Sequence, residues 1–180
     1  MSDIRDRVAE DRGLLKRIQL HIPGFAGYRR REDMRQADSI LRIQVAERLR
    51  GARERMEKVR GTLSDNYLVK ALEPLGGAIF EAQEMEGMIR HGEQGYSGIS
   101  WAIRVEEPEL NKLYEFDLSL LEGVAALDSK VDQLTASPDL AMDIVKEISA
   151  SLAELRSTFK RRWALITEVE QWLHMNGPRG

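Results

Sequence analysis

Apolar residues recur at alternating spacings of three and four along most of this 180-residue chain. Residues with that spacing fall on one face of an α-helix, whereas a half-buried strand would need every second residue to be apolar. The most regular series lies near the end of the chain and consists of Ala141, Val145, Ile148, Leu152, Leu155, Phe159, Ile166, Val169 and Leu173. The pattern therefore predicts a chain built from long amphipathic helices.

Proline, glycine and helix-capping residues divide the chain into helical segments. We predict helices over residues 2–21, 29–63, 66–91, 108–135 and 138–175. Pro74 and the pair Gly76–Gly77 interrupt the third segment, so we expect a kink or two shorter helices there. Three glycines between residues 91 and 98 indicate a loop, and residues 99–105 are interpreted as extended loop or a single helical turn.

The length of these segments predicts the fold class. Helices of about 28 to 38 residues would be roughly 40 to 55 Å long, because each residue adds about 1.5 Å. Alternating spacing is also the coiled-coil pattern, and short connections favour antiparallel neighbours. We predict an all-α fold, an elongated antiparallel bundle of about five helices with coiled-coil-like packing. It forms a single domain over residues 1–180, in which the glycine-rich loop at 91–105 separates the first three helices from the last two.

The composition excludes several kinds of site. The chain has no cysteine, so disulfides, thiolate chemistry and cysteine-based zinc sites are excluded, and we expect a reducing, cytoplasmic location. No run of eighteen uncharged apolar residues occurs, so we expect no transmembrane segment. The sequence also lacks nucleophile-elbow, Walker, Rossmann and Glu-x-x-His motifs. We therefore predict a non-enzymatic chain without catalytic residues, a metal or a cofactor.

Four charged residues interrupt the apolar register, and they are Asp11, Asp38, Asp117 and Arg162. A buried carboxylate needs a charged or hydrogen-bonding partner, because its desolvation costs on the order of several kcal/mol. Arg162, and Arg35 one turn before Asp38, are the candidate partners. We interpret the four residues as a buried charge network that fixes helix register, or as residues that reach water at the edge of the stripe. The alternative is a carboxylate cluster that binds a cation or moves protons.

Charge is distributed unevenly along the chain. Residues 29–60 carry eleven Arg and Lys against six Asp and Glu, whereas residues 106–132 carry eight acids against two bases. The two helices are expected to pack side by side or to pair between subunits. The alternative is that the basic helix contacts phosphate on nucleic acid or on an anionic membrane, mainly through Arg29, Arg30, Arg31 and Arg35.

Two turns place aromatic residues among glycines, at residues 24–28 and 95–99. The aromatic residues of interest are Phe25, Tyr28 and Tyr96. We expect each turn to plug one end of the core with its aromatic ring. The alternative is a surface patch that binds a partner.

Residues 22–38 contain a Pro-Gly-aromatic-x-Gly-Tyr turn followed by an Arg/Glu-rich helix with Arg35-Gln36-Ala37-Asp38, which is close to an Arg-x-x-Ala-Asp step. Together with Gly95–Gly98 and the segment 113–117, this pattern resembles a family of uncharacterised prokaryotic helical-bundle proteins over roughly residues 15–130. The resemblance implies that Asp38 and Asp117 belong to recurring motifs of that family. It implies no activity, cofactor or catalytic residue.

These patterns favour a helical scaffold or adaptor that acts through protein–protein interaction. Because long helical faces suit a second subunit, we expect self-association into a dimer or higher oligomer, or binding of a protein partner. The first alternative is a peripheral binder of anionic lipid or nucleic acid through the basic helix 29–60. The second and weaker alternative is a metal or proton site built from carboxylates.

Overall fold

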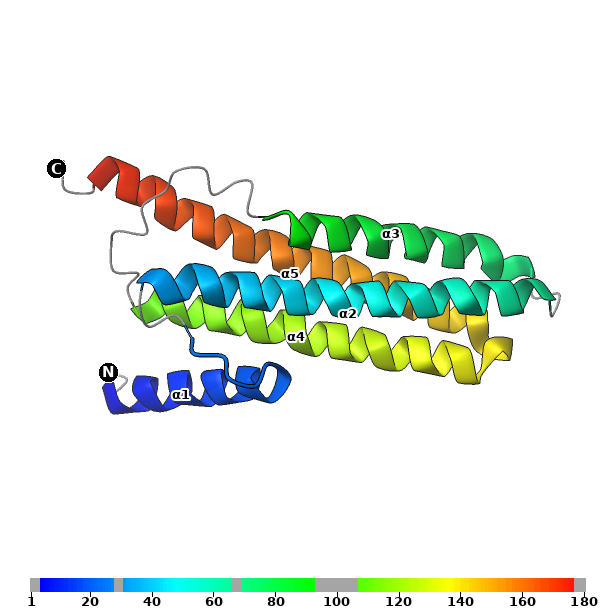
Figure 1. Ribbon diagram of the computed structural model, residues 1–180, viewed down its shortest axis with the longest axis horizontal. Coiled ribbons are helices and arrows are strands. Elements are labelled where there is room, and N and C mark those ends of the chain that lie inside the picture. The colour runs from blue at the N-terminus through cyan, green and yellow to red at the C-terminus, as the bar shows by residue number, and fades with distance from the viewer. Residues whose placement is uncertain (1–3, 28–30, 66–68, 93–106, 177–180) are drawn as a thin grey trace.

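The computed structural model describes residues 4–27, 31–65, 69–92 and 107–176, with side chains described for 13–27, 36–63, 69–92 and 110–166 (Figure 1). Its elements are α1 (Ile4–His21), α2 (Arg31–Asp65), the 3₁₀ turn η1 (Val69–Ala71), α3 (Leu72–Arg90), α4 (Glu107–Ala136), the 3₁₀ turn η3 (Pro138–Leu140) and α5 (Ala141–Asn176). These ranges contain no strand. The expected all-α bundle with five long helices is confirmed.

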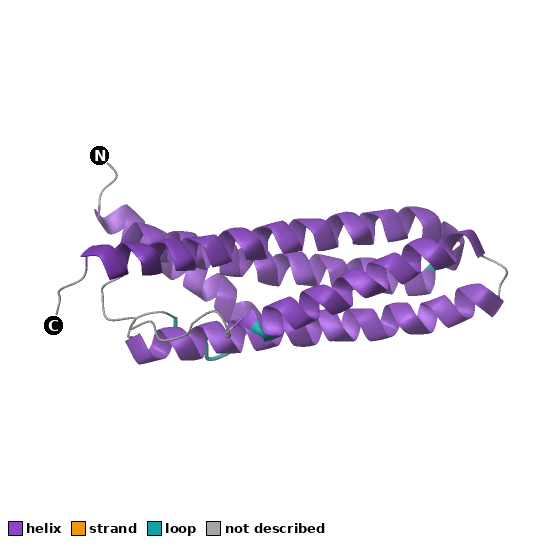
Figure 2. Cartoon of the chain, turned by 90° about the horizontal axis from the view of Figure 1, so that it is seen from above, coloured by secondary structure: helices purple, strands orange, loops and turns teal. Residues whose placement is uncertain are grey.

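Two helical hairpins lie side by side to form the bundle. In each hairpin the helices run in opposite directions, α2 against α3 and α4 against α5 (Figure 1). The hairpins meet through α2 beside α4 and through α3 beside α5, so these neighbours run parallel. Helices α2 and α5 therefore face each other across one diagonal, and α3 and α4 across the other. Figure 2 shows the same long, narrow arrangement from above.

Helix α1 packs against α4 rather than forming a hairpin with α2. It runs in the same general direction as α2, so the expectation that sequence neighbours are antiparallel is wrong here (Figure 1). The reason lies in the segment after α1, which folds back along that helix. Gln19 donates a hydrogen bond of 2.9 Å to the carbonyl of Phe25, and Gly27 lies against Leu15.

The expected break at Pro74 is also wrong. Helix α3 begins at Leu72, so Pro74 lies in its first turn, and Gly76 and Gly77 continue the same helix. Proline is tolerated there because the first backbone N–H groups of a helix have no intrahelical partner to lose. The chain before Pro74 instead forms η1, which leads directly into α3.

The core follows the apolar stripes. The seven members of the final stripe from Ala141 to Ile166 are all buried. They meet buried residues of the other helices, such as Leu49 and Met56 of α2 and Leu127 of α4. Each fully buried Leu, Ile or Phe side chain contributes about 1.5–3 kcal/mol. None of the helices in the described ranges combines the length and apolar character that crossing a bilayer requires.

Candidate functional site

Four charged side chains meet in the interior of the bundle and form what is here named the ionic cluster: Asp38 and Arg42 of α2, Asp117 of α4 and Arg162 of α5. Arg162 donates from Nε to Asp117 Oδ1 and from Nη2 to Asp38 Oδ1, both at 2.6 Å. Arg42 Nε donates to the other oxygen of Asp38 at 2.8 Å. The cluster therefore joins three helices through charge-assisted hydrogen bonds, which are stronger than those between neutral groups.

Local helix geometry explains how the sequence places these groups. Asp38 and Arg42 are four positions apart, so they occupy one face of α2. Arg162 stands between Phe159 and Ile166 in the α5 stripe, at spacings of three and four, and therefore points into the core. The long, planar guanidinium can then bind one carboxylate from each of two facing helices.

Arg42 also connects the cluster to the fourth helix. Its Nη1 donates to the carbonyls of Ile89 and Arg90, each at 3.2 Å. These carbonyls lie at the end of α3, where the last C=O groups lack intrahelical partners and carry the negative end of the helix dipole. Arg42 thus stabilises the terminus of α3 while it neutralises Asp38.

Burial defines the chemistry of the ionic cluster. The side chains of Asp117 and Arg162 are 0% exposed, Arg42 is 3% exposed and Asp38 is 6% exposed. Two positive and two negative groups balance, which is the condition under which charges tolerate a low-dielectric interior. Atoms this deeply buried are out of reach of a substrate in the folded chain.

Sequence reasoning anticipated part of this cluster. The structure brings Asp38, Asp117 and Arg162 together, whereas the side chains of Asp11 and Arg35 lie outside the described set. Arg42 was missed, although its four-residue spacing from Asp38 was a usable signal. Among the described side chains, no group of three or more His, Asp or Glu is placed to hold a metal ion. The carboxylates of Asp38 and Asp117 bind guanidinium groups instead.

Of the two aromatic turns, which were expected to plug the core or alternatively to form a binding patch, the first contains a described aromatic side chain. Phe25 is 2% exposed and belongs to the core, which agrees with the expected plug and not with Phe25 as a surface residue that binds a partner. Nearby Gly27 has a φ of 76°, and a Cβ there would lie 2.5 Å from Tyr114 Oη. Tyr28 and Tyr96 lie outside the described residues.

The basic helix α2 pairs with acids of its own fold. Arg55 contacts Asp128 at 2.6 Å and Asp132 at 3.6 Å, both on the acidic helix α4. Arg53 is partly buried, which opposes its ionisation, but Glu57 and Glu86 outweigh this effect and raise its pKa. The expected side-by-side packing of oppositely charged helices is thus observed between α2 and α4. Arg29 and Arg30 lie outside the described residues, and of Arg31 and Arg35 only the helical backbone is described.

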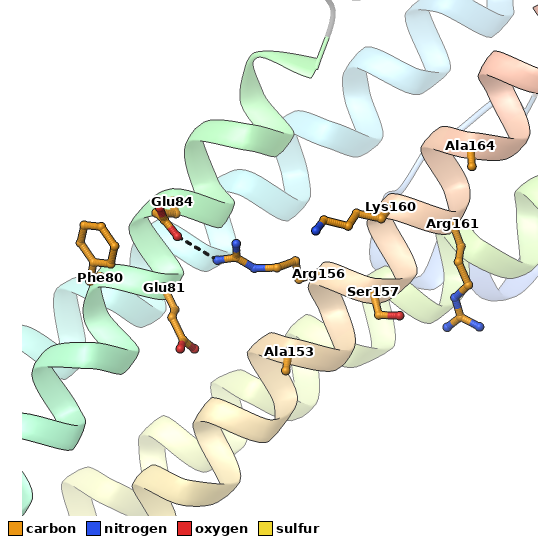
Figure 3. Close-up of a pocket in the computed structure, with 9 residues that line it drawn as sticks. All are labelled: Phe80, Glu81, Glu84, Ala153, Arg156, Ser157, Lys160, Arg161 and Ala164. Carbon is orange, nitrogen blue, oxygen red and sulfur yellow. Dashed lines mark hydrogen bonds and ion pairs between the residues drawn. The ribbon is translucent and has the colours of Figure 1, made fainter.

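The surface carries a second candidate site, a groove of about 830 Å³ between α3 and α5, which we name the α3–α5 groove (Figure 3). Phe80 stands on its α3 edge with 60% of its surface exposed. Glu84 of α3 and Arg156 of α5 bridge its middle at 3.1 Å. Lys160 lines the groove and also a neighbouring cavity of about 300 Å³ between Met88 and Trp163. Unlike the ionic cluster, this site is open to large partners.

Comparison of the chain with protein-family models, curated proteins and solved structures finds no match. The resemblance to prokaryotic helical-bundle proteins stays a prediction, and it assigns no chemistry to any residue. Two candidate sites are presented by the geometry itself, the ionic cluster in the core and the α3–α5 groove on the surface.

Proposed function

We propose that the protein is a non-enzymatic helical scaffold or adaptor that works through protein–protein contacts of its outer helix faces, one of them with a second copy of itself. The observation that carries this proposal is Phe80, a large aromatic residue 60% exposed at the edge of the α3–α5 groove. Exposed aromatic residues beside concave apolar surface are typical of interaction sites. The groove lies between two of the long helices of the bundle, α3 and α5.

The chemistry of the ionic cluster also favours a non-enzymatic protein. Each carboxylate in it accepts hydrogen bonds from a guanidinium, and arginine keeps its proton throughout the physiological pH range. General acid–base catalysis needs a group that exchanges a proton with a reachable substrate. A cluster of buried, mutually paired charges suits a role in holding helices in register.

A second proposal is peripheral binding to an anionic surface, lipid or nucleic acid. It is favoured by four arginines within seven residues, at Arg29, Arg30, Arg31 and Arg35. Arg50, Arg53 and Arg55 of α2 pair with Asp or Glu of the same fold, so the proposal rests chiefly on the segment 29–35. Vesicle flotation and gel shift at low salt test it, since binding to phosphate must weaken as salt is added. No binding at low salt would contradict it.

The scaffold proposal places the protein in the cytoplasm, because a chain without cysteine suits a reducing compartment. Its decisive test is the mass of the whole chain in solution. Sedimentation equilibrium over a rising concentration series is expected to give a mass that approaches twice the 20.5 kDa of one chain. A mass of one chain at every concentration would remove the self-association part of the proposal.

A further inference from the structure

We propose that the cavity of about 300 Å³ beside the end of α3 is a binding site for a small anionic aromatic molecule, a flat ring system that carries a negative group such as a carboxylate. The site adjoins the α3–α5 groove but is separate from it, and it does not depend on the proposed scaffold function. Three features carry the inference: the aromatic wall of the cavity, the basic groups that line it and the neutralised helix end beside it.

The cavity forms where α3 ends and α5 continues. Helix α3 ends at Arg90, whereas the parallel helix α5 extends to Asn176. The lining residues are Met88, His91 and Gly92 at the end of α3, and Phe159, Lys160 and Trp163 on α5. Spacings of three and four place the three α5 residues on one face of their helix. The volume beside this face is at the lower end of the range for small-molecule sites.

The wall on the α5 side is aromatic. The rings of Phe159 and Trp163 stack with their centroids 6.5 Å apart and their planes inclined by 29°. Phe159 is 3% exposed and Met88 packs against the core, so the interior of the bundle holds this wall in place. Sites for small organic molecules are typically lined by aromatic and apolar side chains with a few polar groups. A flat ring in the cavity would pack against Phe159 and Trp163 in the stacked or edge-on arrangements that aromatic pairs prefer.

The polar side chains of the cavity are basic. Lys160 is exposed and makes no ion pair with any residue in the described part of the chain. His91 lines the α3 side, where its imidazole can donate a further hydrogen bond. None of the described residues that line the cavity is acidic. An anionic group on the ligand would therefore meet the ammonium of Lys160 without a competing carboxylate, and charge-assisted hydrogen bonds are the stronger ones.

Arg42 makes the end of α3 compatible with an anion. The carboxyl end of a helix carries partial negative charge, which by itself would repel an anionic ligand. Arg42 Nη1 donates to the carbonyls of Ile89 and Arg90, each at 3.2 Å, so a cation already occupies these two groups. A Cβ at Gly92 would lie 3.5 Å from Trp163 Cζ3 and 3.7 Å from Arg42 Cδ. The neutralised helix end thus adjoins the aromatic wall.

Calorimetric titration of the full chain with naphthalene carboxylate and with naphthalene carboxamide tests the proposal. The two probes share one ring system and nearly one shape, but only the carboxylate is charged. We expect one molecule of the carboxylate to bind per chain, at least about tenfold more tightly than the carboxamide. Equal affinities, or no saturable binding of the carboxylate, overturn the proposal.

A lysine variant tests the source of this preference. Lys160→Met keeps the aliphatic stem and removes the charge, so it is expected to weaken binding of the carboxylate about tenfold and to leave the carboxamide unchanged. Lys146→Met, at an exposed lysine of α5 outside the cavity, is the matched control and is expected to leave both affinities unchanged. A preference for the carboxylate that survives in Lys160→Met contradicts the proposed site.

Two further measurements locate the probe. Trp163→Leu is expected to weaken both probes several-fold, whereas Phe80→Ser, which alters the adjoining groove, is expected to leave both unchanged. The NMR signals of the His91 ring, assigned with His91→Gln, are expected to shift when the carboxylate is added, while those of His21 at the end of α1 stay in place. Weaker binding in Phe80→Ser, or signals of His91 that do not move, overturns the cavity as the site. Circular dichroism verifies that each variant is folded.

Discussion

Arg162 Nη2 lies 2.6 Å from Asp38 Oδ1, and this contact spans the diagonal of the bundle from α5 to α2. The same guanidinium holds Asp117 of α4 through Nε at 2.6 Å. One side chain therefore fixes the relative position of three helices. Ion pairs at single core positions specify register because a slipped helix would leave buried charges without partners.

Replacing Arg162 by Met keeps most of its volume and removes its charge. Asp38 and Asp117 would then both be buried, with Arg42 as the one arginine left in the ionic cluster. We therefore expect a loss of about 3–5 kcal/mol in the free energy of unfolding. Urea denaturation followed by circular dichroism measures it. The matched control is Arg50→Ala, which breaks the exposed Arg50–Glu54 pair and is expected to cost less than about 1 kcal/mol. Equal losses in the two variants would contradict the role of the cluster.

The double variant Asp117→Leu with Arg162→Met removes one negative and one positive group together. The remaining Asp38–Arg42 pair is balanced, so we expect a free energy of unfolding within about 2 kcal/mol of the parent. A double-mutant cycle with the two single variants measures the coupling between the side chains. Additive losses would show that the two residues act independently.

Gly27 is constrained twice, by its φ of 76° and by the nearness of Tyr114 Oη. Gly27→Ala is therefore expected to lower the free energy of unfolding by more than about 1 kcal/mol. Gly24 has a similar φ of 82°, but a methyl group added there would have no neighbouring atom within 4 Å, so Gly24→Ala meets backbone strain alone. Thermal denaturation is expected to give a lower melting temperature for Gly27→Ala than for Gly24→Ala. The reverse order would contradict the close approach of Tyr114 to Gly27.

A hydrogen bond from Arg90 lowers the pKa of Glu47, an effect that desolvation only partly opposes. A lowered pKa in the folded state stabilises the fold at neutral pH, and the contribution is lost as the pH falls through that pKa. Arg90→Gln is expected to move the pKa of Glu47 back toward its ordinary value, as measured by NMR titration of the side-chain carboxyl. Arg156→Gln serves as the control and should leave Glu47 unchanged.

Helix positions and most of the core were predictable because apolar spacing reports them directly. Asp38, Asp117 and Arg162 were noticeable for the same reason, since each replaces an apolar residue in a stripe. Arg42 was harder to see, because a second arginine near a stripe is ordinary on a solvated helix edge. Only the approach of the α3 terminus makes it a buried residue.

Features that depend on contacts between helices could not be predicted from the spacing of apolar residues. The direction of α1 depends on how residues 22–27 return along that helix, and no periodic signal encodes this. The α3–α5 groove arises where two parallel helices are not closely packed, and single-helix patterns do not reveal it. Coiled-coil packing, the oligomeric state and the role of the segment 29–35 stay predictions.

Hydroxyl-radical footprinting of the whole chain at rising concentration tests self-association at the exposed face around Phe80 most directly. Mass spectrometry reads the oxidation rate of Phe80, with Leu20 and Leu140 as exposed internal standards on α1 and in η3. We expect the rate at Phe80 to fall as concentration increases while the rates at Leu20 and Leu140 stay constant. A rate at Phe80 that does not change with concentration would contradict the account.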